Sequence, residues 1–219
     1  MIASTKLKST YAKYAKVPSS GNLTGAEVAK RIMAANDIYG VTVQEISGEL
    51  TDHYDPAKKT VNLSKSIYQG TSIAALGVAA HECGHVIQDN TEYFPLRLRH
   101  ALVPVANIGS NLGVPLILIG ILFGGVIGNA ELSDTLINIG LLAFGLAVLF
   151  QVVTLPVEYN ASNRAREQLY SLGLITEEEK KPVKEVLSAA ALTYVASALS
   201  GALQLLRLFL LTGGNSRRK

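Results

Sequence analysis

The chain has 219 residues, of which 48% are apolar and 17% are charged, whereas about a quarter of the residues are charged in ordinary soluble domains. This composition excludes a disordered chain, a coiled coil and a collagen-like fibre, and it argues against a purely soluble protein. The net charge of +3 is too small to indicate binding to nucleic acid, so no nucleic-acid partner is predicted. A single cysteine excludes a disulfide framework.

A helix is predicted near the N-terminus. Thr24 and Glu27 form a capping box, in which each side chain accepts a backbone N–H that the start of a helix leaves unpaired. Apolar residues at helical spacing follow, and the pattern ends near Asn36.

Three short strands are predicted next, at 41–46, 49–54 and 59–63, where β-branched residues alternate with polar ones. Asp55-Pro56 predicts a turn between the last two strands. Residues 72–89 then have the composition of a helix. Helices combined with a small sheet indicate the α+β class for this part of the chain.

Two long uncharged runs follow, at 101–130 and 135–157. A helix needs about 20 mostly apolar residues to cross the hydrocarbon layer, so each run is long enough to span it. Recurrent glycines in both runs are typical of closely packed membrane helices. A pair of buried core helices is the alternative, although a chain of this size rarely contains two in succession. A third uncharged run, 186–206, either spans the bilayer or packs against the other helices at its surface.

The motif HECGH carries the chemistry. It places His81 and His85 four residues apart on the predicted helix, so both imidazoles lie on one face, as two ligands of a tetrahedral Zn²⁺ require. Glu82 lies beside them and can reach a metal-bound water without being a ligand. Two surface histidines on an ordinary helix are the alternative, but the apolar residues on both sides of the motif argue against an exposed helix.

A catalytic zinc site needs a third protein ligand and an open position for water. A further histidine six residues after the motif is absent, because Thr91 stands there, and Gln88 replaces the glycine that would precede it. A distant glutamate is the better candidate, and Glu158 follows the second apolar run directly. If the two runs form a hairpin across the bilayer, the chain returns at Glu158 to the side of His81 and His85.

Several alternatives remain open for the third ligand. Glu158 could instead cap a helix predicted at 160–172, which Gly173 would end. Four other side chains qualify as ligands by residue type alone: Glu92, Asp89, His100 and His53. Cys83 points away from the histidine face, so we expect a small buried residue there rather than a ligand.

The predicted chemistry is metal-assisted hydrolysis. Zn²⁺ lowers the pKa of its water towards about 7, and Glu82 accepts the proton and passes it to the leaving amine. An oxyanion donor is also needed. The candidates, each of which also fits a packing or surface role, are Tyr159, His53, Tyr54 and Arg164. The strand that ends at Tyr54 could offer its edge to an extended peptide.

Seven stretches distributed over nearly the whole chain resemble the YugP-like neutral zinc metallopeptidases, a family of bacterial membrane proteins. They are YAKYAKVPS, LTGAEVAKRIM, LTDHYDPAKKTVNLS, GTSIAALGVAAHECGH, ALVPVANIGSNLGVPL, LPVEYNASNRA and LTYVASALSGALQLLRL. The resemblance implies a zinc-dependent, membrane-bound peptidase with His81 and His85 as ligands and Glu82 as general base. Members of that family usually begin with an apolar anchor before the first stretch, and this chain starts just after it.

The segment EYNASNRA is also similar to the third-ligand segment of the HtpX-like and CAAX-prenyl-protease-like gluzincins, in which the leading glutamate binds zinc. That resemblance implies Glu158 as the third ligand. Those relatives carry an aspartate four residues later, where this chain has Ser162. We therefore expect the support of His81 or His85 to come from elsewhere.

Charges around the two runs predict an orientation in the cell membrane. Arg97 and Arg99 precede the first run, whereas Arg164 and Arg166 follow the second. The intervening loop, expected at 131–134, contains acidic residues and no basic ones. The positive-inside rule then places the zinc site on the cytoplasmic face of a multi-pass protein.

The sequence therefore predicts an α+β fold: a small zincin-like catalytic domain, with a short sheet and the HExxH helix, combined with transmembrane helices. Residues 1–100 form the N-terminal part of that domain, 101–157 a transmembrane hairpin, 158–185 the third-ligand segment, and 186–219 a C-terminal apolar helix. The predicted function is a membrane-bound zinc endopeptidase whose partners are a protein or peptide substrate and the lipid bilayer.

Two other functions compete with this prediction. In the first, the chain is a non-catalytic membrane module, whose zinc or apolar helices serve assembly. In the second, it is an intramembrane protease, which normally carries its metal-binding helix inside a long apolar run. A polar hairpin at 49–65 precedes the HECGH helix here, and the apolar stretch around the motif is short of a membrane span, so this second function is disfavoured.

Overall fold

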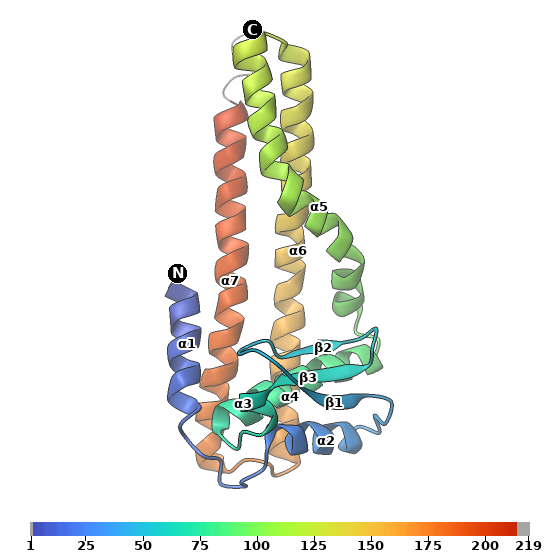
Figure 1. Cartoon of the computed structure of the whole chain (residues 1–219), viewed down its shortest axis with the longest axis vertical. Helices are drawn as coiled ribbons and strands as arrows, with labels where there is room; N and C mark the ends of the chain where they lie inside the picture. Colours follow the sequence, from blue (N-terminus) through green and yellow to red (C-terminus); the bar gives the residue numbers. More distant parts are fainter. Residues whose placement is uncertain (1, 214–219) are drawn as a thin grey trace. The chain divides into compact units, whose positions relative to one another are not determined.

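A computed structural model describes residues 2–213 of the chain (Figure 1). The chain divides into two compact units, one made of Met1–Leu96 with Pro156–Thr193 and the other of Arg97–Leu155 with Tyr194–Lys219. The described elements in chain order are α1 (Ile2–Tyr14), α2 (Gly25–Ala35), β1 (Thr42–Ile46), β2 (His53–Asp55), β3 (Thr60–Ser64), α3 (Lys65–Tyr68), α4 (Ile73–Asn90), α5 (Phe94–Leu122), the π-helical turn η1 (Phe123–Ile127), α6 (Ala130–Ser171) and α7 (Glu177–Gly213).

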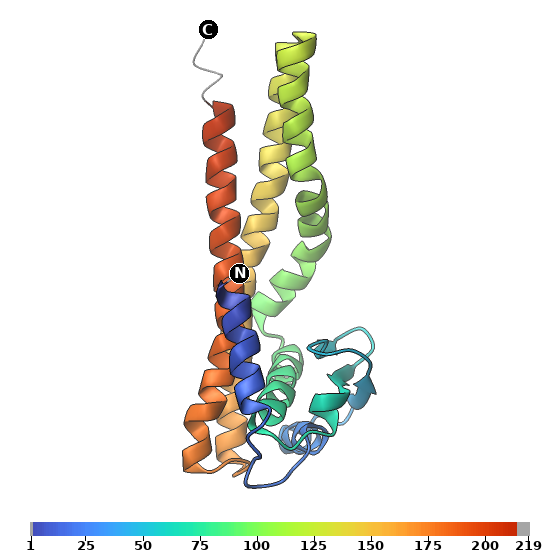
Figure 2. The same cartoon turned by 60° about the vertical axis from the view of Figure 1, so that its left-hand side comes forward.

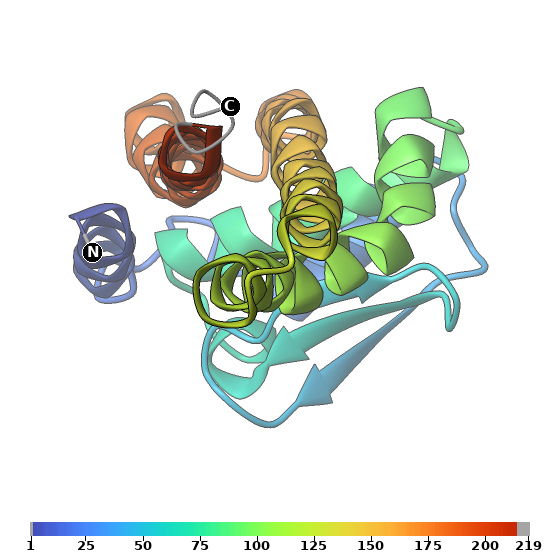
Figure 3. The ribbon, with the colours of Figure 1, turned by 90° about the horizontal axis from the view of Figure 1, so that it is seen from above.

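The sheet of the first unit has the order β1-β3-β2, with β3 parallel to β1 and antiparallel to β2. Its strands lie side by side next to α4 (Figure 3). The central strand β3 is buried at every position, as a strand covered on both faces should be. The predicted turn is present, because the Asp55 carboxylate accepts the backbone N–H groups of Ala57 and Lys58 at 2.9 and 3.0 Å.

The second predicted strand is shorter than expected. Only His53–Asp55 pairs with β3, whereas the pattern predicted a strand from residue 49. Gly48 and Leu50 have φ angles of +103° and +55°, which a strand cannot adopt. The chain therefore turns through this segment before it joins the sheet.

The helices of the first unit follow their predicted signals. Both bonds of the capping box between Thr24 and Glu27 are present, and α2 ends at Ala35, with Asn36 as its C-cap. Ser72 caps α4 by accepting the N–H of Ala75 at 3.2 Å. The core lies between α2, α4, the sheet and the last part of α6, with Ile32 among its fully buried side chains. A buried side chain of this size contributes about 1.5–3 kcal/mol relative to an exposed one.

The turn between the two apolar runs lies earlier than predicted. Gly128 adopts a left-handed φ of +72°, and the Asn129 side chain accepts the N–H of Leu132 at 3.1 Å. Since Asn129 caps the next helix, residues 131–134 form its first turn rather than a loop. Acidic residues such as Glu131 are stabilised there by the helix dipole.

The second run and the predicted helix at 160–172 are one helix. α6 runs from Ala130 to Ser171 and continues through Pro156, so Glu158 lies inside it and caps nothing. The helix ends where predicted, because Gly173 takes a φ of +61° and the N–H of Leu174 bonds the carbonyl of Leu169 at 3.0 Å.

In the second unit, α5 and α6 run side by side (Figure 2) and approach through small residues. A Cβ atom at Gly109 would lie 2.1 Å from the carbonyl oxygen of Ala143, and one at Gly140 would lie 2.7 Å from that of Gly113. The glycines therefore permit backbone contact of the kind that membrane helices use.

Within the described residues 2–213, three helices are long and apolar enough to cross a membrane: Phe94–Ile127, Ala130–Ser171 and Glu177–Gly213. Their most apolar segments have mean hydropathies of 2.0, 2.3 and 1.6, so the third run belongs to a helix that also qualifies. Large apolar side chains such as Leu118 and Leu142 are mostly exposed along them. Exposed surfaces of this kind fit a hydrocarbon environment rather than water.

Candidate metal centre

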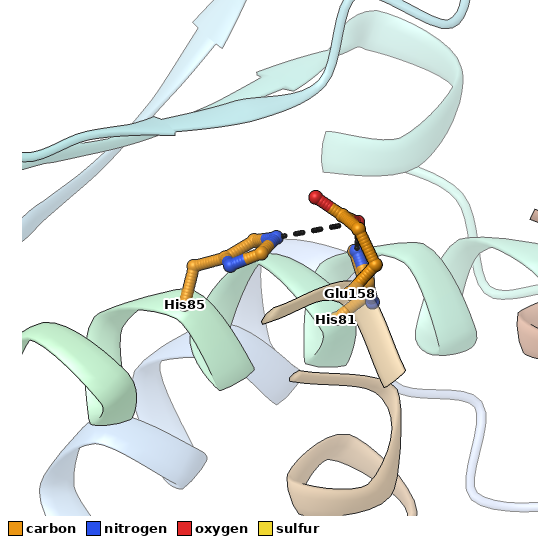
Figure 4. Close-up of side chains that lie close together, drawn as sticks. All are labelled: His81, His85 and Glu158. Carbon is orange, nitrogen blue, oxygen red and sulfur yellow. Dashed lines mark hydrogen bonds and ion pairs between the residues drawn. The ribbon is translucent and has the colours of Figure 1, made fainter. Parts of the chain in front are cut away.

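Helix α4 places His81 and His85 on one face, one turn apart (Figure 4). Their ring centroids are 4.9 Å apart, and the rings meet edge to face. Only 13% and 11% of the two side chains are exposed. The helix is therefore buried around its motif, which disagrees with the alternative of two surface histidines.

Glu158 reaches the same point from α6, as Figure 4 shows. Its Oε2 atom lies 3.2 Å from His81 Nε2 and 3.7 Å from His85 Nε2, and its side chain is 2% exposed. Among the described residues this is the one cluster of three or more histidine, cysteine or acidic side chains that could hold a metal ion, with all three donor atoms within 4.8 Å of one another.

Gly84 brings α4 and α6 close enough for this convergence. A Cβ atom at Gly84 would lie 2.3 Å from the carbonyl oxygen of Ala161 and 3.0 Å from its Cα atom. The α6 side of the contact is also small, since Ala161 and Ala165 are fully buried. Gly84, the variable residue of the motif that precedes His85, is therefore a packing residue. Its backbone contact with Ala161 determines how closely α4 and α6 approach at the site.

Gly84→Ala is expected to destabilise the protein by about 1–3 kcal/mol, because a methyl group cannot enter a backbone contact without moving one helix. The melting temperature in detergent should fall. Gly77→Ala is the matched control on α4, since a Cβ there would meet only a side-chain atom of Val186, at 3.5 Å. Equal stability of the two variants would contradict the proposed packing role.

The donor set fits Zn²⁺. Two imidazole nitrogens and one carboxylate oxygen are the ligands of many catalytic zinc sites, which leave a fourth position open. Tetrahedral ligands at about 2.0–2.2 Å from the ion lie about 3.3–3.6 Å from one another. The separations between the Glu158 oxygen and the two Nε2 atoms are 3.2 and 3.7 Å, one just below and one just above that range.

The other ring nitrogens of the histidines also have partners. Nδ1 of His85 lies 3.0 Å from Oε1 of Gln88, and Nδ1 of His81 lies 3.1 Å from Oγ of Ser162. The Nε2 atoms are thus the ones that face Glu158. Ser162, which departs from the aspartate of the gluzincin pattern, itself contacts His81, whereas His85 contacts Gln88. The expectation of support from elsewhere is therefore confirmed for His85 and wrong for His81.

Electrostatics favour an ionised carboxylate at Glu158, the residue directly after the uncharged run 135–157. Burial alone would raise the pKa of this carboxyl group. The hydrogen bonds and charges of His81 and His85 outweigh that effect, so the pKa of Glu158 lies well below its usual range.

Glu82 directly follows His81 in the chain and is buried, with 7% of the residue exposed. Within residues 2–213, its carboxylate makes neither a hydrogen bond nor an ion pair. It therefore differs from Glu158, which the two histidines hold. The carboxylate that follows His81 in the chain is thus unpaired among the described residues, as a proton-exchanging group would be.

The competing ligands lie outside this cluster. Asp89 accepts hydrogen bonds from Tyr54 Oη at 2.7 Å and from Lys59 Nζ at 2.6 Å, so it ties the β2–β3 hairpin to α4. His53 is exposed on β2, and its Nδ1 atom lies 2.7 Å from the carbonyl oxygen of Thr51. Glu92 and His100, the two remaining candidates, are not among the three residues that the structure brings together.

The candidate oxyanion donors are mostly engaged with other groups. Burial and the bond to Asp89 raise the pKa of Tyr54, whose hydroxyl is already donated. Arg164 donates its Nε–H to Asn160 and lies over the ring of Tyr93, whereas Tyr159 is 45% exposed.

Cys83 is a buried packing residue, as expected. Its Sγ atom lies 3.6 Å from the carbonyl oxygen of Ala29 on α2. Burial raises the pKa of its thiol, which disfavours the thiolate that a metal would need.

Gln88 is the site residue that sequence reasoning missed. It is fully buried and contacts both His85 and α6. A polar residue three positions after a ligand, directly behind the apolar pair Val86 and Ile87, was the available signal. Its meaning depends on partners that lie 69 and 72 residues away along the chain.

Comparisons with known proteins identify the family of this chain. The chain belongs to the family described as "Putative neutral zinc metallopeptidase", which matches residues 1–213. It is 47% identical over 205 residues to a Bacillus subtilis (strain 168) protein called "Putative membrane protease YugP", a match that covers 94% of this chain and 88% of that protein. No solved structure matches the chain.

Proposed function

We propose that this protein is a membrane-bound zinc endopeptidase, in which His81, His85 and Glu158 hold the metal and Glu82 is the general base. The observation that supports it most directly is the meeting of three ligand atoms from two helices, 73 residues apart between His85 and Glu158 along the chain, within 4.8 Å. The family and its membrane-protease relative support the same chemistry.

Each residue has a distinct part in the proposed reaction. A bound Zn²⁺ would supply Lewis-acid chemistry, since it lowers the pKa of a coordinated water and polarises a peptide carbonyl. The unpaired carboxylate of Glu82 takes the proton from the attacking water and returns it to the leaving amine. The low exposure of the two histidines and Glu158 keeps bulk water away from the ligands.

The proposed substrates are proteins or peptides at the surface of the bilayer. Glu158 directly follows the uncharged run of α6, so the site is one residue beyond an apolar segment of the same helix. The arginines at 97 and 99 and at 164 and 166 favour the cytoplasmic face of the cell membrane for this site. β2 is an edge strand and could pair with an extended peptide.

Removal of the metal tests this proposal. Purified protein in detergent should cleave an unfolded protein substrate, should lose that activity after dialysis against a zinc chelator, and should regain it when Zn²⁺ is restored. Cleavage is expected because the site has both a metal-ligand set and a free carboxylate.

The alternative is the non-catalytic membrane module, whose zinc serves assembly. It predicts protein that binds zinc and cleaves nothing, and whose oligomeric state changes on chelation. Undiminished cleavage after complete chelation would contradict the metallopeptidase mechanism, and metal-loaded protein inactive on a broad set of unfolded substrates would favour the module.

A further inference from the structure

The amide of Gln88 connects the two helices that carry the cluster. Its Nε2 atom lies 2.8 Å from the carbonyl oxygen of Val157 and 3.0 Å from Oδ1 of Asn160, both on α6. Its Oε1 atom lies 3.0 Å from Nδ1 of His85 on α4. The side chain is fully buried, so water does not compete for these bonds.

The chemistry of the partners determines which way the amide faces. A backbone carbonyl such as that of Val157 can only accept, so the Gln88 atom facing it must be the NH₂ group. The Asn160 contact leads independently to the same orientation. Nε of Arg164 can only donate and lies 2.8 Å from Oδ1 of Asn160, so the Asn160 atom that faces Gln88 is an acceptor. Both acceptors on α6 therefore require the donor end of Gln88.

The orientation of the amide sets the state of His85. With NH₂ directed at α6, Gln88 presents its carbonyl oxygen to Nδ1 of His85, so Nδ1 carries the proton. In a neutral imidazole the other nitrogen, Nε2, then has the lone pair. Nε2 is the atom that lies 3.7 Å from the Glu158 carboxylate.

His81 lacks this constraint. Its Nδ1 atom lies 3.1 Å from the hydroxyl of Ser162, which can donate or accept and so permits either tautomer. Gln88 also differs from Ser162 in its second contact, because its partner Val157 directly precedes the ligand Glu158 in the chain. One side chain thus contacts one ligand and the backbone next to another.

We infer that Gln88 is a positioning residue, which holds His85 with its Nε2 lone pair towards the metal and ties α4 to the turn of α6 that bears Glu158. This inference rests on the proposed function, because His85 needs a free Nε2 lone pair only if it binds zinc. The bond from Nδ1–H to Gln88 can form before any metal binds, whether or not Nε2 also carries a proton beside Glu158.

The first test is the zinc affinity of Gln88→Met, a variant of similar length that cannot form the three bonds. Loss of such an outer contact costs about 10–100-fold in metal affinity. Competition against a chromophoric chelator should show a weakening of that size. Gln168→Met is the matched control on α6, since it loses a 2.8 Å bond to Asn36 far along the helix from the ligands, and it should bind zinc like the wild type. Wild-type affinity in Gln88→Met would overturn the inference.

The second test needs neither metal nor activity, and it remains available if Gln88→Met does not fold. Nitrogen NMR of metal-free wild-type protein, above the titration range of histidine, should show His85 protonated at Nδ1, and His85→Asn can assign the signal. An Nδ1 atom without a proton would refute the role of Gln88 even if the protein proved to be a zinc peptidase. A wild type that binds no zinc would instead refute the proposed function and leave the tautomer result intact.

Discussion

Glu158→Gln is expected to abolish stable zinc binding. The substitution replaces a buried carboxylate, the single anionic ligand of the cluster, by a neutral amide of the same size, and leaves two histidines as ligands. The loss of affinity should exceed the roughly 10–100-fold that loss of an outer contact costs. Metal analysis should find about one zinc per wild-type chain and little in the variant, because a catalytic zinc site takes three protein ligands.

Glu167→Gln provides a matched control for this measurement. Glu167 lies on the same helix, is exposed, and is not among the three clustered residues. The control separates a specific loss of the ligand from a general effect of removing a negative charge. Full zinc occupancy in Glu158→Gln would remove Glu158 from the ligand set and return the choice to the other acidic and histidine candidates.

The sequence predicted the helix ends that are determined by interactions between residues close together in the chain. The capping box at Thr24 and Glu27 marks the start of α2 because its two bonds form within one turn. Gly173 ends α6 because glycine, which has no Cβ atom, adopts a left-handed φ without steric strain. The predicted start of the second strand was wrong because Leu50 adopts a left-handed backbone conformation. A pattern of residue types does not reveal such a conformation in a leucine.

The site was predictable only in part. The spacing of His81 and His85 on a helix is sufficient to place both rings on one face. The approach of Glu158 depends on the contact between Gly84 and Ala161, which joins residues distant in the chain. The continuity of α6 was not predicted either, because the sequence pattern separates an apolar run that ends at residue 157 from a polar helix that begins at residue 160, and here the two are one helix.

Gln88 shows why polar residues within a motif helix are hard to interpret from sequence. As a residue type it suggests only an exposed position or a broken histidine pattern. Its burial becomes understandable once Val157 and Asn160 lie within hydrogen-bond distance, since a buried amide is stable only when its bonds are made. Long-range packing therefore determines its role.

Glu82→Gln is expected to retain zinc and to lose almost all hydrolysis. Glutamine has the same shape as glutamate but cannot accept a proton from water at neutral pH, and a positioned general base contributes about 10²–10⁴-fold to the rate. Because the Glu82 carboxylate makes no hydrogen bond or ion pair within the described part of the chain, the substitution breaks no structural contact. Initial rates on the same unfolded substrate, measured beside zinc content, provide the comparison.

Zinc content and hydrolysis rate must be measured together to assign the general-base role to Glu82. Loss of zinc together with activity would show only that Glu82 supports the site, whereas loss of activity at full zinc occupancy isolates a proton-transfer role. Glu167→Gln should keep both properties, since its carboxylate is exposed and outside the cluster. A Glu82→Gln protein that hydrolyses at the wild-type rate would contradict the general-base assignment and favour a membrane module whose metal has no catalytic part.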